Sequence, residues 1–133
     1  MQVIKKSASF FNTVRQSIFY FKPNGFDSRK AKGKIAAQAG HACVDVVLKA
    51  LNKNDNRIKE WLMQGSTKIC VYVDSEEELL NVAKIAYEKG IAASIITDAG
   101  MTEFHNVPTK TCLALEPLPT DVADELTGHL PLY

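Results

Sequence analysis

The alternation of apolar and polar residues along the chain predicts four strands and four helices. The strands are short runs of apolar and β-branched residues at 17–21, 68–73, 91–97 and 110–115. The helices repeat apolar residues at steps of three and four, over 33–52, 56–64, 76–89 and 121–127. In the order β-α-α-β-α-β-β-α, these elements predict an α/β fold, a three-layer sandwich in which helices flank a four-stranded mixed β-sheet.

Local signals set the boundaries of several of these elements. Ser75 followed by three glutamates is a capping box, which brings acidic side chains to the positive end of the third helix. Gly65, Gly90 and Gly128 stand where the second, third and fourth helices should end. The run 68–73 is almost continuously apolar, so we expect that strand to be buried on both faces of the sheet.

Composition narrows the class of protein. With 133 residues, 46% hydrophobic and 23% charged, the chain has ordinary globular composition, which favours one domain over a disordered or disulfide-dense chain. The apolar runs are far shorter than the roughly 20 residues that cross a bilayer, so no membrane partner is expected. The three cysteines stand among apolar neighbours, which is typical of buried thiols in a reducing compartment such as the cytoplasm. None has the spacing of a zinc site, and neither a metal nor another cofactor is expected.

Charge is distributed unevenly, although the formal net charge is only +1. Residues 1–34 carry eight basic side chains against one acidic side chain, a net charge of +7, and the rest of the chain carries −6. A basic end of this kind is typical of contact with an acidic partner such as nucleic acid. The first 21 residues hold no acidic residue and several aromatic ones, so a targeting segment, a strand and a packing arm all stay open there.

The first helix carries a narrow polar stripe that packing alone does not require. Steps of three and four bring its members to one side of the helix: Lys34, Gln38, His41, Asp45 and Lys49. One interpretation is the solvated face of an amphipathic helix. The other is a ligand site, because small residues flank the stripe and the helix begins with Gly33 among lysines, where an anion such as phosphate would bind.

A second group of candidate residues follows the third predicted strand, in the sequence Asp-Ala-Gly-Met-Thr at 98–102. Loops after the carboxyl ends of strands are where α/β sheets hold ligands, so Asp98 and Thr102 are candidates for chemistry. The alternative is a turn in which Asp98 only caps backbone N–H groups. No Ser or Cys stands in a nucleophile-elbow motif, which disfavours covalent catalysis.

Four motifs together resemble one protein family. They are Lys-Gly-Lys-Ile-Ala-Ala-Gln-Ala-Gly-His-Ala at 32–42, Trp61 with Gly65, the segment 98–102, and Thr-Gly-His-Leu-Pro-Leu-Tyr at 127–133. In order and spacing they resemble the archaeal and eukaryotic-type peptidyl-tRNA hydrolases over residues 30–133. The resemblance implies an α/β domain at 30–133, preceded by an atypical segment at 1–29 that includes the first strand, with one domain overall.

The resemblance also implies a function and a set of site residues. Members of the family hydrolyse the ester that joins a nascent peptide to the 3′ ribose of tRNA, which recycles tRNA during translation, and they are often dimers, so a homodimer is expected. Carried onto this sequence, the catalytic positions are Lys34, Gln38, Asp98, Thr102 and Thr111, with support from His41, Gly33 and Gly100. The tRNA phosphates are expected to meet Arg29, Lys30 and Lys32.

Ester hydrolysis assigns a task to each of these groups. We expect Asp98 to orient or deprotonate a water molecule, and Lys34 with Gln38 to stabilise the oxyanion that forms. Thr102 and Thr111 would position the water or the ribose, and His41 would brace the site.

The sequence departs from the family pattern in three places. The family's first strand could correspond to residues 1–4 or 17–21, and Glu103 stands where the family has a glutamine. The loop before the last strand lacks a glycine, so either Thr109 or Thr111 could take the last site position. A different class of function therefore stays open, a non-catalytic RNA- or protein-binding module on the same fold.

Overall fold

A computed structural model describes the chain except for residues 1–12, 24–25, 27–28, 30, 54 and 99–106. The described elements are, in order, β1 (Val14–Phe21), α2 (Lys32–Ala50), α3 (Arg57–Met63), β2 (Lys68–Val73), α4 (Glu76–Glu88), β3 (Ala93–Asp98), β4 (Thr109–Leu115), β5 (Leu118–Pro119) and α5 (Thr120–Thr127). The predicted order of strands and helices is confirmed. The short strand β5 is an addition that the sequence pattern did not predict, since two residues are too few to show a period.

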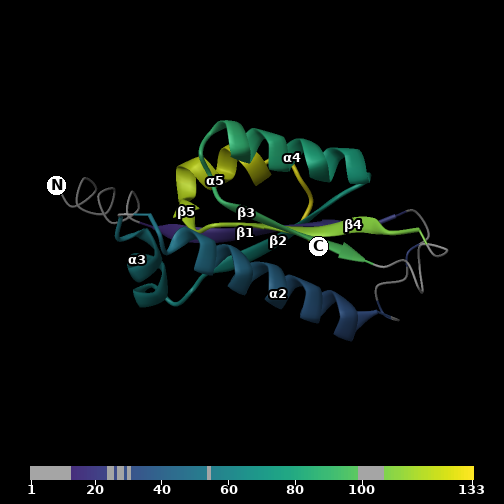
Figure 1. Cartoon of the computed structure of the whole chain (residues 1–133), viewed down its shortest axis with the longest axis horizontal. Helices are drawn as coiled ribbons and strands as arrows, with labels where there is room; N and C mark the ends of the chain where they lie inside the picture. The colour runs from purple at the N-terminus through teal and green to yellow at the C-terminus, as the bar shows by residue number, and fades with distance from the viewer. Residues whose placement is uncertain (1–12, 24–25, 27–28, 30, 54, 99–106) are drawn as a thin grey trace.

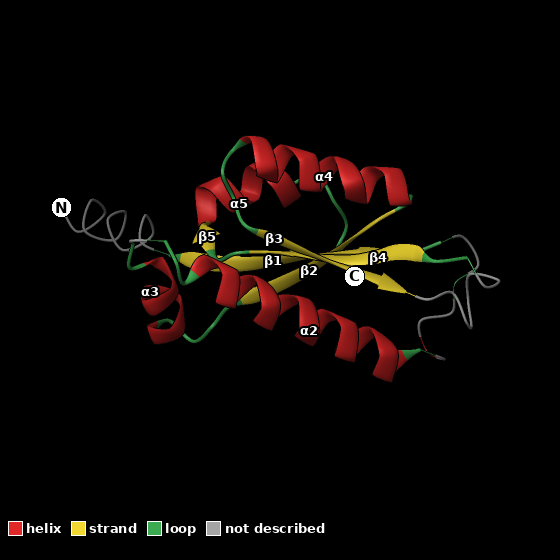
Figure 2. Cartoon of the chain, in the orientation of Figure 1, coloured by secondary structure: helices red, strands yellow, loops and turns green. Residues whose placement is uncertain are grey.

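Three strands have their carboxyl ends at the same end of the sheet. Four strands follow the order β2-β1-β4-β3, and β5 pairs with the beginning of β1. β1 runs parallel to β2 and antiparallel to β4, which in turn runs antiparallel to β3. The carboxyl ends of β1, β2 and β3 therefore lie at the same end of the sheet, and α2 begins there (Figure 2).

Helices cover both faces of the sheet, as the predicted three-layer sandwich requires (Figure 1). α2 and α3 lie on one face, and α4 and α5 lie on the other. The side chains of β1 alternate between these layers: Ile18 and Tyr20 pack with Val46 of α2, whereas Phe19 packs with Leu79 of α4. The central strand thus contributes to both halves of the core.

The predicted helix caps are confirmed. The Ser75 hydroxyl accepts a 3.1 Å hydrogen bond from the backbone N–H of Glu78, and the Glu78 carboxylate accepts one of 3.2 Å from the backbone N–H of Asp74. Gly65 and Gly90, just beyond α3 and α4, adopt φ values of +99° and +72°. Glycine enters this left-handed region without the steric cost of a Cβ atom, so these two residues end their helices.

Two predictions about the strands need correction. The prediction that the strand 68–73 is buried on both faces is wrong, because on the face away from α4 Lys68 is exposed and Cys70 and Tyr72 are only half-buried. β2 is also an edge strand of the sheet. Its apolar run reflects Val71 and Val73, which face the core, and a short antiparallel bridge from Val71 to Leu132 that covers part of the edge. The first strand begins at Val14 rather than at residue 17, and residues 1–4, the other candidate, lie outside the described residues.

In the part of the chain that the structure describes, no helix is both long enough and apolar enough to cross a membrane.

Candidate functional site

The polar stripe of α2 lies against the edge strand β3. Lys34 and Gln38 reach Asp98 at the carboxyl end of β3. One helical turn after His41, Asp45 accepts a hydrogen bond from Ser94, earlier in the same strand. The stripe therefore joins the helix to the sheet at Lys34, Gln38 and Asp45, whereas His41 and Lys49 are exposed as on a solvated face.

Asp98 is the buried acid of this site. Its side chain is 5% exposed, and its Oδ2 atom lies 2.7 Å from Nζ of Lys34. The same oxygen accepts a 3.1 Å hydrogen bond from Nε2 of Gln38. A carboxylate buried in this way must be compensated by charge or hydrogen bonds, and Lys34 supplies both. The Lys34 side chain is itself 32% exposed, so a cation stands between the buried acid and solvent.

The amide of Gln38 connects this ion pair to the sheet. Its Oε1 atom accepts a 2.9 Å hydrogen bond from the Thr111 hydroxyl on β4 and a second hydrogen bond from the Tyr20 hydroxyl on β1. Side chains from α2, β1, β3 and β4 thus converge at the end of the sheet where β1 and β3 finish. Ligands of α/β proteins characteristically bind at this carboxyl end of the strands.

Tyr20 is the member of this network that sequence reasoning missed. Its position in β1, two residues after Ile18 on the face toward α2, is the only signal that could have identified it. Burial, the largest cause, raises the pKa of Tyr20 well above its usual value of 10.0, and nearby negative charge adds to the effect. The phenol therefore stays protonated and acts as a hydrogen-bond donor.

The two candidate threonines of β4 differ in their contacts. Thr111 is fully buried and donates to Gln38. The hydroxyl of Thr109 instead donates a 2.9 Å hydrogen bond to the backbone carbonyl of Val107. Of the two residues that the sequence left open, Thr111 is the one that contacts the network.

Other predicted site residues lie around this network or outside the described chain. His41 is exposed on α2, and its charge is a minor cause of the lowered pKa of Asp45, behind the hydrogen bonds from Ser94 and Lys49. Gly33 lies in the first turn of α2, where an added Cβ atom would meet no other atom within 4 Å. Arg29 and Lys32 are exposed near that turn. Lys30, Gly100 and Thr102 lie outside the described residues.

The beginning of α2 is strongly positive. No acidic residue stands in its first turn, and no side chain caps it at Ala31. Lys32 and Lys34 add two positive charges to the helix end that is already positive through its backbone dipoles. Asp98 offsets part of this charge, and the remainder favours an anionic ligand.

Comparison with known proteins decides the family. The family model described as "Peptidyl-tRNA hydrolase PTH2" matches residues 14–133. The chain belongs to this family. The resemblance that the sequence motifs indicated is thereby confirmed, and the matched region includes every described residue of the network around Asp98.

Individual relatives agree with this membership. The peptidyl-tRNA hydrolase of Nanoarchaeum equitans is 44% identical over 102 residues, which cover 77% of this chain and 88% of that protein. The peptidyl-tRNA hydrolase of Methanocaldococcus jannaschii is 41% identical over 106 residues, covering 80% and 91%. A solved structure of a protein of unknown function from Agrobacterium tumefaciens strain C58 has a TM-score of 0.53 at 11% identity, over 90% of this chain and 97% of that one. It shows a similar fold only.

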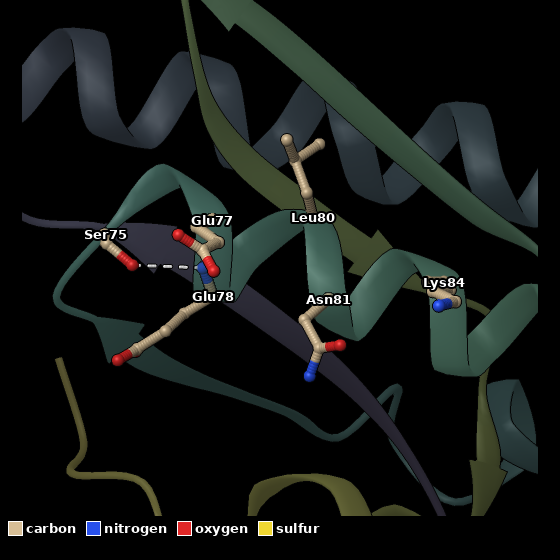
Figure 3. Close-up of a pocket in the computed structure, with 6 residues that line it drawn as sticks. All are labelled: Ser75, Glu77, Glu78, Leu80, Asn81 and Lys84. Atoms are coloured by element: carbon tan, nitrogen blue, oxygen red, sulfur yellow. Dashed lines mark hydrogen bonds between the residues drawn. The ribbon is translucent and has the colours of Figure 1, made fainter.

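A cavity over α4 is not part of the site in this member of the peptidyl-tRNA hydrolase family. It has a volume of about 580 Å³, and Figure 3 shows the six residues that line it: Ser75, Glu77, Glu78, Leu80, Asn81 and Lys84. The Ser75 hydroxyl is engaged in capping α4, and two glutamates face the space. α4 covers the face of the sheet opposite to α2, and an acidic lining would repel the phosphates of tRNA.

The cysteines of this family member are structural. Cys43, Cys70 and Cys112 form no disulfide. Burial raises the pKa of Cys70 to about 11 and that of Cys112 to about 12, so neither is a thiolate near neutral pH. The prediction of buried, unreactive thiols is confirmed for Cys43 and Cys112, while Cys70 is half-buried. In the part of the chain that the structure describes, no group of three or more His, Cys, Asp and Glu residues could hold a metal ion.

Proposed function

We propose that this chain hydrolyses the ester bond between peptide and tRNA in peptidyl-tRNA and so returns tRNA to translation. The observation that carries the proposal is the buried carboxylate of Asp98, held by Lys34 and Gln38 at the carboxyl end of the strands, where ligands of α/β sheets bind. Membership of the peptidyl-tRNA hydrolase family supports the same reaction. The alternative of a non-catalytic binding module finds no support among the relatives, which bear the name of the hydrolase.

The reaction needs a nucleophile and a stabilised oxyanion. Asp98 orients a water molecule and takes its proton while the water oxygen attacks the ester carbonyl carbon. The ammonium group of Lys34 and an N–H of Gln38 stabilise the negative oxygen of the tetrahedral intermediate. The intermediate then breaks its bond to the ribose oxygen, which takes up the proton, and the products are a peptide acid and tRNA with a restored hydroxyl.

The remaining site residues hold the substrate or support this pair. Thr111 acts through the Gln38 amide, to which it donates. We assign Thr102 to the positioning of water or ribose, and His41, Gly33 and Gly100 to support of the site. Arg29, Lys30 and Lys32 contact tRNA phosphates near the positive end of α2, without regard to nucleotide sequence.

The test is release of labelled peptide from peptidyl-tRNA by the purified protein. Lys34→Ala should lower kcat about 10²- to 10³-fold, because it removes the stabilising charge. Asp98→Asn should lower kcat about 10²- to 10⁴-fold, because it removes the base. Lys49→Ala is the matched control: it removes a lysine from the same stripe of α2, about 22 Å along the helix axis from Lys34, and should leave kcat within about twofold.

Two results would contradict the proposal. The wild-type protein would show no turnover, or Lys34→Ala and Asp98→Asn would both retain full turnover while remaining folded. Near-ultraviolet circular dichroism of each variant separates loss of chemistry from loss of structure.

We further propose that two copies of the chain associate through an apolar face of α2 and α3. Five large apolar side chains are exposed there: Val44, Leu48, Leu51, Leu62 and Met63. A cavity of about 210 Å³ between the two helices, lined in part by Trp61, continues this face. Exposed apolar patches of this kind mark interfaces, and one patch can pair with its own copy about a twofold axis.

The mass in solution, measured by light scattering, tests this association. The wild-type protein should have the mass of a dimer, and Leu48→Glu should have the mass of a monomer. Leu80→Glu, on the exposed side of α4, is the control and should stay dimeric. A monomeric wild-type protein would contradict the proposal.

We also propose that the protein acts in the cytoplasm. Its three unpaired thiols suit a reducing compartment, and the proposed substrate is a product of translation. Fractionation of the source cells with an antibody to the chain tests this, and recovery in a membrane or secreted fraction would contradict it.

A further inference from the structure

Tyr20 occupies a place in the site that neither the sequence motifs nor the proposed mechanism assigns. Its hydroxyl donates a hydrogen bond to Oε1 of Gln38, whose Nε2 atom donates to Asp98. We propose that Tyr20 is a positioning residue for peptidyl-tRNA hydrolysis, which holds the Gln38 amide in the orientation that delivers its N–H groups to Asp98 and the substrate. The inference rests on the proposed roles of Lys34 and Asp98.

The hydrogen bonds of the Gln38 amide explain why an anchor is needed. A glutamine side chain turns about several torsions, and its amide offers two acceptor positions on oxygen and two donors on nitrogen. Tyr20 and Thr111 fill both acceptor positions of Oε1, and Asp98 takes one N–H. The second N–H is thereby directed by three fixed contacts, and the amide cannot rotate without breaking them.

The phenol of Tyr20 is itself held rigidly. Its ring contacts the ring of Tyr133 edge to face, with 5.5 Å between centroids and an interplanar angle of 74°. Tyr133 is fixed in turn, because its backbone N–H donates a 2.9 Å hydrogen bond to the carbonyl of Cys70 in β2. The Tyr20 hydroxyl is therefore positioned by its own strand, β1, and by Tyr133, which is bound to β2.

The hydroxyl, rather than the ring, is the part that packing does not explain. The ring lies in an apolar cluster with Ile18, Ala42 and Cys112, and a phenylalanine would fill the same space. Burial also keeps the phenol protonated at neutral pH, so it donates a hydrogen bond and does not serve as a base. Because the hydroxyl donates to the Gln38 amide, and that amide contacts Asp98, Tyr20 acts on the site through Gln38.

The experiment compares kcat and KM for peptidyl-tRNA in the full-length protein. Tyr20→Phe removes the hydroxyl and keeps the ring; it should lower kcat about tenfold, the effect of one lost hydrogen bond, with KM unchanged within about twofold. In a Gln38→Met background the same substitution should have no further effect on kcat, because the amide that Tyr20 orients is absent. Tyr72→Phe, which changes another tyrosine that contacts Tyr133, is the control and should match the wild type.

Three outcomes separate the inference from the proposed site. If Lys34→Ala abolishes turnover but Tyr20→Phe keeps kcat within about twofold of the wild type, the inference is wrong and the site stands. If Tyr20→Phe lowers kcat equally in the wild-type and Gln38→Met backgrounds, Tyr20 does not act through Gln38 and the inference is again wrong. If Lys34→Ala and Asp98→Asn both retain full turnover, the proposed site fails and the inference fails with it.

Discussion

The Thr111 hydroxyl donates a 2.9 Å hydrogen bond to Oε1 of Gln38, although 73 residues separate the two in the chain. The contact joins β4 to α2 directly beside Asp98, so the orientation of the Gln38 amide depends on a strand that is distant from it in the sequence. The Thr111 hydroxyl is shielded from water, since Thr111 is only 1% exposed. Loss of the hydroxyl cannot be repaired there by solvent, which gives the contact a measurable effect on catalysis.

We therefore expect Thr111→Val, which keeps the shape of the side chain, to lower kcat about tenfold. Thr111→Ser keeps the hydroxyl and should retain most of the activity. Thr109→Val is the control, because that hydroxyl donates to the backbone of Val107 and should leave kcat within about twofold. Steady-state release of peptide measures all three, and equal activity of the Val and Ser variants would contradict the expectation.

The positive end of α2 predicts binding of tRNA that weakens as salt rises. Each phosphate contact contributes a slope of about 0.7 to 0.9 when the logarithm of affinity is plotted against that of salt concentration. The double variant with Arg29→Ala and Lys32→Ala should lower this slope by about 1.5. Lys84→Ala, on α4 at the opposite face of the sheet, should leave it unchanged. Filter binding or fluorescence anisotropy gives the slopes, and an affinity independent of salt would exclude the phosphate contacts.

Most of the fold could be predicted from the sequence because each element has local signals. The period of α2, the capping box at Ser75 and the glycines 65 and 90 all depend on residues close in sequence, and the structure confirms them. The burial of β2 could not be predicted in the same way. A run of apolar residues does not distinguish a central strand from an edge strand whose outer side is covered by a distant segment near Leu132.

The candidate site divides along the same line. Lys34, Gln38 and Asp98 could be identified because helical spacing and the end of a strand are properties of local sequence, and the structure brings them together. Tyr20 could not be identified, because its contact with Gln38 depends on how α2 packs across β1. The choice between Thr109 and Thr111 likewise depends on which of two neighbouring hydroxyls is directed toward α2.

The buried carboxylate of Glu116 predicts a stability effect far from the site. Its side chain is 3% exposed and pairs with Lys53 and with Arg57, the latter at 3.3 Å, and it accepts a 2.6 Å hydrogen bond from the backbone N–H of Ala92. Glu116→Gln removes the charge that pairs with both cations, which keep Gly90 and Asp55 as partners, so the free energy of unfolding should fall by about 1 to 3 kcal/mol. Urea unfolding measures the loss.

Activity provides a second measurement for the same variant. Glu116 follows the last residue of β4, and the site lies near the first, a separation of roughly 20 Å along the strand. Glu116→Gln should therefore keep the wild-type kcat at temperatures where it is folded. Glu125→Gln, which breaks a 3.9 Å surface pair with Lys89, is the control and should change stability by less than about 0.5 kcal/mol. A Glu116→Gln variant as stable as the control would contradict the assignment of a buried ion-pair cluster.

Three groups whose pKa values rise on folding, Tyr20, Cys70 and Cys112, predict that stability falls in alkaline solution. The folded protein raises the pKa of Cys70 to about 11 and of Cys112 to about 12, from 9.0, and that of Tyr20 above 10.0, in each case mainly through burial. The unfolded chain loses these protons from about pH 9 upward while the folded chain retains them, so the unfolded state binds fewer protons and the free energy of unfolding decreases as pH rises. The contribution is complete below pH 9 and is lost progressively through the folded pKa values. Urea unfolding at pH 7, 8, 9 and 10 should show that these groups contribute a constant free energy of unfolding up to about pH 8 and a smaller one beyond it. The decline should be less steep in Cys112→Ala. An equally steep decline in that variant would exclude Cys112 as a source.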